Sequence, residues 1–168
     1  MYEYAPLLTK RKERMIAILL LFLGLGLFGF SRIPGIPIPV IYQALGMLCL
    51  VATVGLVSRY LTRRYTYRVE PRDDGVEDNV PDLVITEYYA RRVLVVCRIS
   101  VADIVEILPI TDETQAEIKE KRGKQSFYDY TADLFSQNRY FLTVSDGEHH
   151  FCMRILADEE LLKWLQKA

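Results

Sequence analysis

Two apolar stretches near the N-terminus decide the architecture of this 168-residue chain: MIAILLLFLGLGLFGF (Met15–Phe30) and VIYQALGMLCLVATVGLV (Val40–Val57). They lie within charge-free runs of 17 and 26 residues, and no later part of the chain approaches that length. A membrane-spanning helix needs ~20 predominantly apolar residues. The sequence therefore predicts a transmembrane helical hairpin, with one helix over residues 15–31 and the second over residues 38–58.

The connector between the two stretches, SRIPGIPIP (31–39), predicts a tight turn. Its three prolines and Gly35 do not continue a helix, and so short a connector leaves no room for a translocated domain. A cleaved signal peptide is the alternative interpretation of the first stretch. That alternative requires a small-residue cleavage site, which GFSRIPGIP (29–37) does not resemble, and it leaves the second stretch unexplained.

Positive charge is concentrated at the two outer ends of the predicted hairpin, while the turn carries only Arg32. Lys and Arg near the ends of membrane helices favour the cytoplasmic side, and each contributes ~1 kcal/mol beside anionic lipid. We therefore predict a multi-pass protein of the plasma (inner) membrane with both termini cytoplasmic. The residues expected to contact the anionic membrane surface are Lys10, Arg11, Lys12, Arg14, Arg59, Arg63 and Arg64.

The charge balance differs between the two parts of the chain. Residues 1–68 carry nine Lys and Arg against two acids, a net charge of +7, and residues 69–168 carry twelve against twenty, a net charge of −8. An acidic soluble part disfavours nucleic acid as a partner, because phosphate neutralisation requires a basic face. The predicted domains are a cytoplasmic basic N-terminus (1–14), the hairpin (15–58) and a cytoplasmic soluble domain (60–168).

No motif in the sequence indicates catalysis or metal binding. The three cysteines lack CxxC spacing, and no G-x-S-x-G, H-E-x-x-H or glycine-rich phosphate loop is present. Two features were weighed as metal ligands. His149 and His150 are adjacent and would point to opposite faces of a strand, and the acidic run within residues 73–78 lacks the spacing of a calcium loop. We expect no catalytic, cofactor-binding or metal-ligating residues, no cofactor and no enzymatic activity.

The soluble part has the alternation typical of β-strands. Strands are predicted over 65–70, 82–89, 92–100, 103–110, 127–133 and 139–145, and a last one follows Asp146-Gly147, a strong hairpin signal. An exposed helix or loop is expected between Thr111 and Gly123. Asp158 is a good N-cap for a closing helix, whose Leu161, Trp164 and Leu165 form one apolar stripe.

This order of elements resembles a pleckstrin-homology-like barrel, in which seven antiparallel strands are closed by a C-terminal helix. A two-span hairpin joined to the first strand resembles the bacterial membrane proteins that carry such domains. The stretch YDYTADLFSQNRYFLTVSDGEHHFCMRILADEELLKWL (128–165) is similar to an uncharacterised Firmicute-type family with a YxY strand and a closing D-E-x-L-L helix. The resemblance covers roughly residues 60–168. It implies an α+β fold, with a seven-stranded antiparallel barrel or sandwich that follows a membrane hairpin. It does not indicate any particular activity, because one fold hosts many functions.

One loop departs from the lipid-binding members of this fold. Those members hold phosphoinositide head groups with Lys and Arg after the first strand, whereas the loop Pro71–Pro81 contains one Arg and four acids. Acidic side chains repel a polyanionic head group. Phosphoinositide recognition is therefore not expected.

Two functions are predicted from different classes. The first is a membrane-anchored, non-enzymatic interaction or scaffold module, whose barrel offers a sheet edge or groove to a partner. The alternative is a structural or assembly subunit of a larger membrane complex, indicated by polar Gln43 and by a small-residue stripe, which is better explained by packing against the first span. The sequence does not identify the protein partner or show whether the chain forms a homo-oligomer. It also does not distinguish a peptide from a lipid as the ligand of the groove. The expected helix-packing residues are Gly46, Cys49 and Thr53.

Overall fold

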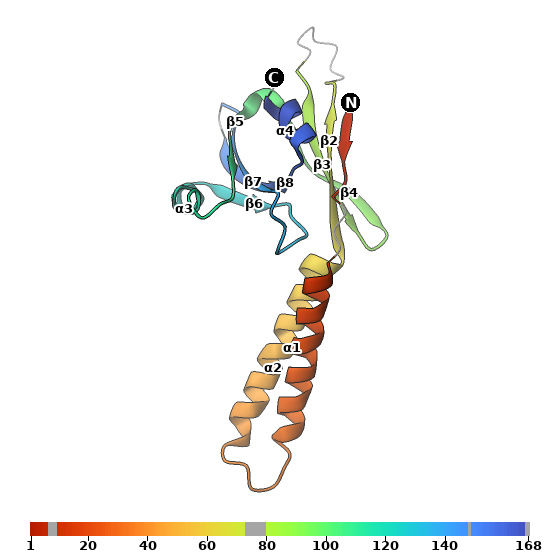
Figure 1. Ribbon diagram of the computed structural model, residues 1–168, viewed down its shortest axis with the longest axis vertical. Coiled ribbons are helices and arrows are strands. Elements are labelled where there is room, and N and C mark those ends of the chain that lie inside the picture. The colour runs from red at the N-terminus through yellow and green to blue at the C-terminus, as the bar shows by residue number, and fades with distance from the viewer. Residues whose placement is uncertain (7–9, 73–79, 148, 167–168) are drawn as a thin grey trace. The chain divides into compact units, whose positions relative to one another are not determined.

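The computed structural model describes residues 1–6, 10–72, 80–147 and 149–166 (Figure 1). The described residues form four α-helices and eight β-strands, and the strands make two four-stranded sheets. The chain divides into two compact units. One unit is the helical hairpin Leu8–Arg63 together with Ala132–Leu134, and the other is an α+β unit made of the remaining residues.

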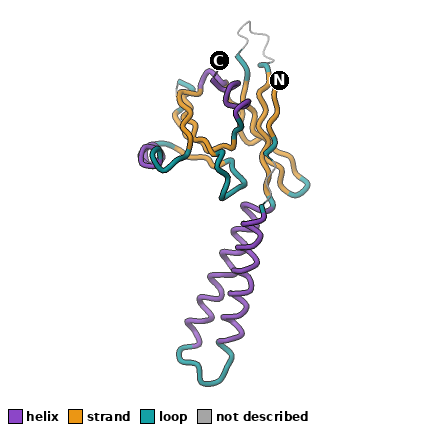
Figure 2. Tube along the Cα trace, in the orientation of Figure 1, coloured by secondary structure: helices purple, strands orange, loops and turns teal. Residues whose placement is uncertain are grey.

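The hairpin unit consists of two antiparallel helices that lie side by side (Figures 1 and 2). Helix α1 covers Arg11–Phe30, and helix α2 covers Pro39–Leu56 and continues into a π-helical turn, η1, at Val57–Leu61. Pro39 occupies the first turn of α2, where the amide hydrogen that proline lacks is not needed. Helix α1 begins four residues earlier than the charge-free stretch, so its first turn carries charged residues.

The first sheet of the α+β unit has the order β1-β2-β3-β4. Strand β1 (Tyr2–Tyr4) precedes the hairpin in the chain and pairs antiparallel with β2 (Arg63–Glu70), which follows it, so that Tyr4 is opposite Tyr67. Strands β3 (Asp82–Tyr89) and β4 (Arg92–Ser100) complete the sheet with the bounds that the sequence predicts.

The second sheet has the order β5-β7-β8-β6. A short 3-10 turn, η2 (Val101–Asp103), leads from the first sheet into β5. Strand β7 pairs antiparallel with both β5 and β8, whereas β6 runs parallel to β8. The strands are β5 (Ile104–Pro109), β6 (Ser126–Asp129), β7 (Arg139–Ser145) and β8 (His150–Leu156).

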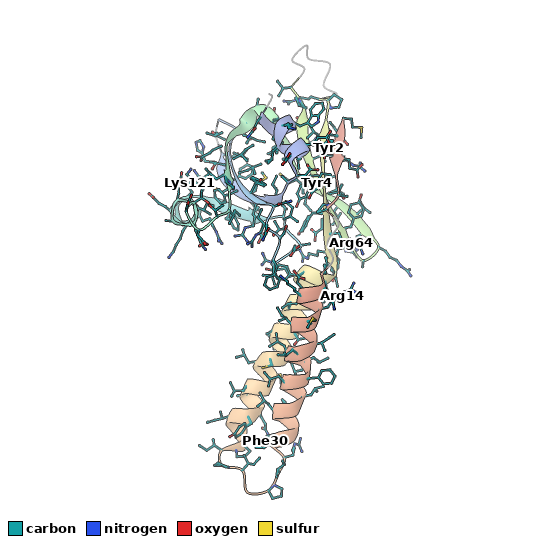
Figure 3. The ribbon with its side chains drawn as sticks, viewed as in Figure 1. Tyr2, Tyr4, Arg14, Phe30, Arg64 and Lys121 are labelled. Atoms are coloured by element: carbon teal, nitrogen blue, oxygen red, sulfur yellow. The ribbon has the colours of Figure 1, made fainter. Side chains whose placement is uncertain are left out.

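Two short helices complete the α+β unit. Helix α3 (Gln115–Lys124) buries Ile118 against Phe141 and Cys152 of the second sheet, and the Lys121 ammonium donates to Glu106 and Glu117 (Figure 3). Helix α4 (Glu159–Gln166) buries Leu161 and Leu165. Its N-cap is Asp158, as the sequence predicts, because the Asp158 carboxylate accepts the Leu161 amide hydrogen at 2.8 Å.

Tyr67 links the two sheets through a fully buried hydroxyl. This hydroxyl donates to the Tyr130 carbonyl at 2.7 Å and accepts from the Leu156 amide at 3.2 Å. Burial raises the pKa of Tyr67 above its ordinary value, so the phenol stays neutral and able to donate. The apolar side chains around it are fully buried: Val69, Leu83, Ile85, Leu142, Val144, Met153, Ile155 and Leu161.

The structure corrects the predicted barrel in three respects. Its described residues contain eight strands rather than seven, because Tyr2–Tyr4 adds a short edge strand that the sequence pattern does not indicate. The two sheets do not close into a barrel. The sheets are not wholly antiparallel either, since β6 is parallel to β8 and ends at Asp129, before the predicted end at Asp133. The α+β class and the two apolar N-terminal helices are confirmed.

Replacing Tyr67 by Phe tests the link between the sheets. The substitution removes one hydroxyl and leaves two buried backbone groups without a partner, so we expect the free energy of unfolding to fall by about 2 kcal/mol. Urea unfolding of the detergent-solubilised chain, followed by fluorescence of its one tryptophan, Trp164, measures the change. Tyr128→Phe is the control, since Tyr128 is exposed, and should stay within about 0.5 kcal/mol of the parent. Equal effects of both substitutions would contradict the assignment.

Candidate membrane anchor and docking cleft

The two hairpin helices approach each other closely at Gly24 of α1 and Gly46 of α2. A Cβ atom built on Gly46 would lie 2.9 Å from the Gly24 carbonyl oxygen and 2.9 Å from Phe28 Cδ2. A Cβ atom on Gly24 would lie 3.1 Å from the Gly46 carbonyl oxygen. A Cβ atom at position 46 would force the backbones apart, and one at position 24 would make a tighter contact than usual, which is a common reason for small residues between membrane helices.

Three further small residues of the hairpin are buried or half-buried. Ala17 of α1 and Thr53 of α2 are buried, and Cys49 is half-buried. The Thr53 hydroxyl donates to the Cys49 carbonyl at 2.8 Å, which satisfies it without a partner outside the helix. Gly46, Cys49 and Thr53 are thus placed along one side of α2, and Gly46 directly faces α1 of the same chain.

The outer faces of both helices expose large apolar side chains. These include Phe22 at 69 % exposure and Val40 at 68 %, with Leu19, Leu25, Leu48 and Val51 between the helix ends. A core helix of a soluble protein would bury such residues. Both helices are long and apolar enough to cross a membrane, at Arg11–Phe30 and Pro39–Leu61.

The predicted membrane-surface residues divide into two groups. Arg11, Lys12, Arg14, Arg59 and Arg64 are exposed, and Figure 3 shows Arg14 at the opposite end of α1 from Phe30. Lys10 is buried instead, and its ammonium donates to the Arg63 carbonyl at 2.6 Å. The Lys10 side chain therefore joins the residue before α1 to the first residue of β2. Arg63 itself is only partly exposed.

Glu13 is a feature of the anchor that sequence reasoning missed. It lies in the first turn of α1 and is only 2 % exposed. Its carboxylate accepts the Leu134 amide hydrogen at 3.2 Å, which fixes the tripeptide Ala132–Leu134 to the hairpin unit. An acid at a helix N-terminus is also favoured by the helix dipole.

The packing of the two helices can be tested with two glycines of α2. Gly46→Ile forces the helices apart, and overpacking of this kind costs about 1–3 kcal/mol, so the loss of helical circular dichroism on heating in detergent should occur at lower temperature. Gly55→Ile is the matched control, because a Cβ atom there meets no atom within 4 Å. If the two variants melt alike, the Gly24–Gly46 contact does not hold the hairpin together.

A polar cleft of about 320 Å³ lies in the α+β unit, where the end of β4 meets the turn between β7 and β8. Asp82 of β3 and Arg98 of β4 form an ion pair across adjacent strands of the first sheet. Phe151 of β8, in the second sheet, also lines the cleft. The described residues that line the cleft are Arg72, Asp82, Arg98, Ile99, Ser100, Asp103, Asp146 and Phe151.

Arg98 is the central cation of this cleft. Its Nε lies 3.0 Å from Asp82 Oδ2, and its Nη2 lies 4.0 Å from Glu70 Oε2 at the end of β2. Just over half of the Arg98 side chain is exposed, so these ion pairs contribute at most about 1 kcal/mol each. A guanidinium held this loosely remains able to exchange an intramolecular carboxylate for one on a ligand.

The two thiols of the α+β unit are poor nucleophiles. Burial raises the pKa of Cys152, whose Sγ donates to Gln125 Oε1 at 2.8 Å. Burial also raises the pKa of Cys97, although the Tyr130 hydroxyl bonded to its sulfur acts in the opposite direction. A raised thiol pKa lowers the fraction of reactive thiolate at neutral pH. Both cysteines are free.

The two histidines and the acidic run are the features that the sequence predicts not to bind metal. His149 and His150 are exposed beside the β7–β8 turn. The acidic run Asp73, Asp74, Glu77 and Asp78 lies outside the described residues. Within residues 1–6, 10–72, 80–147 and 149–166, no three His, Cys, Asp or Glu side chains gather closely enough to hold a metal ion.

Comparison with known proteins does not place the chain in a family. No protein-family model, no curated protein and no solved structure gives a significant match to it. The function is therefore argued from the two features described above, the apolar hairpin and the polar cleft.

Proposed function

We propose that the chain is a membrane-anchored, non-enzymatic interaction module. The helical hairpin spans the plasma (inner) membrane with both termini cytoplasmic, and the α+β unit presents its polar cleft to a protein partner. The observation that carries the proposal is the cleft itself, which combines exposed charge with partly exposed Ile99 and Phe151. Charged groups around a small apolar floor are typical of sites that recognise a peptide segment.

The position of the cleft within the first sheet supports this role. Strand β2 begins at Arg63, two residues after the membrane helix ends at Leu61, and it ends at Glu70 beside Arg98. The cleft therefore lies at the end of the sheet that is farther along the chain from the membrane helix. A docking site at that end leaves room for a cytoplasmic partner.

The charge of the cleft indicates the chemistry of the partner. Three acids and two arginines line it, and the part of the chain after residue 68 carries a net charge of −8. A negative surface steers a basic partner toward itself and repels an acidic one. The partner segment is thus a basic peptide, whose cationic side chain pairs with Asp103 or Asp146.

The pleckstrin-homology-like resemblance stays a prediction, since no family model and no solved structure matches the chain. The open sheets and the parallel β6 differ from such a barrel. The resemblance contributes no activity to the proposal, because one fold carries many functions.

A photoreactive residue at Ile99 tests the cleft. In native membranes it should form a discrete crosslinked product with a second protein, and Asp103→Lys should reduce the yield about tenfold, since a like charge opposes the basic partner. Immunoblotting of the tagged chain measures the yield. The control Asp112→Lys makes the same charge change at an exposed position away from the cleft. The same product from a photoreactive residue at Val105, which is exposed on β5, would contradict a specific cleft.

Cysteine labelling tests the proposed orientation in a chain whose native cysteines are replaced by alanine. Ile33→Cys, in the hairpin turn, should react with an impermeant thiol reagent in intact cells, and Ser136→Cys should react only after lysis, because basic flanks stay cytoplasmic. Ile33 is used instead of Gly35, because Gly35 has a positive φ of 92°. Labelling of Ser136→Cys in intact cells would reverse the orientation.

The alternative function, a structural subunit that packs through its hairpin, has weaker support. The small-residue stripe on which that alternative relied is used within the chain, where Gly46 contacts Gly24. The observation that still supports the alternative is Gln43, a half-buried polar residue within an apolar helix.

A further inference from the structure

The tip of the β3–β4 hairpin, Tyr88–Val95, carries apolar side chains that the α+β unit leaves uncovered. Val93, Leu94 and Val95 are 59 %, 54 % and 63 % exposed. Successive residues of a strand point to opposite faces, so both faces of β4 are apolar and exposed here. A strand at the surface of a soluble domain normally has one polar face. Tyr89, beside the turn, is 43 % exposed.

The tip is also a basic part of an acidic domain. Between Glu87 and Asp103 the chain contains Arg91, Arg92 and Arg98 and no acid. Arg91 and Arg92 form the end of the tip and are exposed. Exposed arginines next to tyrosine and aliphatic side chains are the combination that binds the interface of an anionic membrane.

The topology of the first sheet brings this tip to the end from which the chain enters the membrane helices. The contact between Arg98 and Glu70 places the end of β2 beside the end of β4. The start of β2, at Arg63, is therefore at the same end of the sheet as the β3–β4 turn. Only Thr62 separates Arg63 from Leu61, the last residue of the second candidate span, so along the chain this is the end of the sheet nearest to the hairpin.

An irregularity in β4 makes strand addition a poorer explanation of the exposed tip. Ile85 pairs with Cys97 but Thr86 pairs with Val95, so Val96 is an extra residue and the register shifts. Such a bulge interrupts the regular edge that a partner strand needs. The segment before the bulge, Arg92–Val95, offers only a short ladder.

We propose that the β3–β4 tip is a third membrane contact, which inserts Val93, Leu94 and Val95 into the head-group region and places Arg91 and Arg92 on lipid phosphates. The inference rests on the membrane anchoring proposed above but not on the protein-binding cleft. The occupant of the tip is the bilayer surface that the two helices enter. The acidic remainder of the domain is held away from that surface by its own charge.

Lipid-attached quenchers test the proposal on the full chain, with native cysteines replaced by alanine and Trp164 fluorescence used to verify folding. A fluorophore at Leu94→Cys should be quenched by head-group-level spin labels in phosphatidylcholine–phosphatidylglycerol vesicles about twofold or more above the same fluorophore at Val105→Cys. Val105 is the matched control, because it is an exposed aliphatic residue on the edge strand of the other sheet. Equal quenching at the two positions overturns the inference.

A charge change separates lipid contact from other occupants. Arg91→Glu with Arg92→Glu should lower the quenching at Leu94→Cys to the Val105 level, while Lys119→Glu with Lys163→Glu, exposed elsewhere, should not. Crosslinking of Leu94→Cys to a second copy or to another protein would overturn the inference and leave the anchor intact. A fluorophore at Leu48→Cys, exposed on α2, reports the anchor separately, and its failure to be quenched by deep acyl-chain labels would refute the membrane hairpin itself.

Discussion

The pairing of β1 with β2 is the constraint on which the rest of the structure depends. The chain begins in the first sheet, leaves it for the helical hairpin and returns as the neighbouring strand, with Tyr4 opposite Tyr67. The hairpin is therefore an insertion between two adjacent antiparallel strands, and not a leader placed before an independent domain. Both ends of the inserted hairpin connect to the same end of one sheet, so a chain that crosses a membrane through this hairpin would cross it an even number of times.

Contacts at the two ends of β1 reinforce this pairing. The Tyr4 and Tyr67 rings stack with their centroids 6.2 Å apart, and Arg68 Nε lies 3.1 Å from the Glu3 carboxylate. The Tyr2 hydroxyl donates to Asp158 at 2.7 Å, so the residue that caps α4 also holds the first strand. Burial and the carboxylate beside it raise the pKa of Tyr2, which keeps this donor protonated. A three-residue strand persists because its side chains contact both β2 and the N-terminal cap of α4.

Residue patterns predict those parts of the fold whose stability is local. The charge-free runs indicate both helices, and alternation indicates β3, β4, β7 and β8. Strand β1 has too few residues for a pattern, and its partner lies beyond the whole hairpin. Alternation around Phe127 indicates a strand but not its neighbour or direction, so the parallel pairing of β6 with β8 is not predictable from it.

The candidate sites are also predictable from the sequence only in part. Gly46 is identified by its spacing with Cys49 and Thr53, whereas its partner Gly24 is not, because Gly24, Gly26 and Gly29 lack a strict GxxxG spacing. The cleft has no sequence motif at all. Its charged groups come from separate strands and turns, and only the meeting of two sheets brings Asp82, Arg98 and Asp146 together.

The insertion of the hairpin between β1 and β2 has a consequence for biosynthesis. Strand β1 is synthesised before the two helices, and its partner β2 only after them. If the hairpin spans a membrane, as proposed, β1 and β2 can pair only after the second helix has returned the chain to the side of the membrane on which β1 lies. Pairing of the two strands would then depend on both crossings, and a chain that crossed only once would leave the edge of β2 unpaired, which is an aggregation-prone feature.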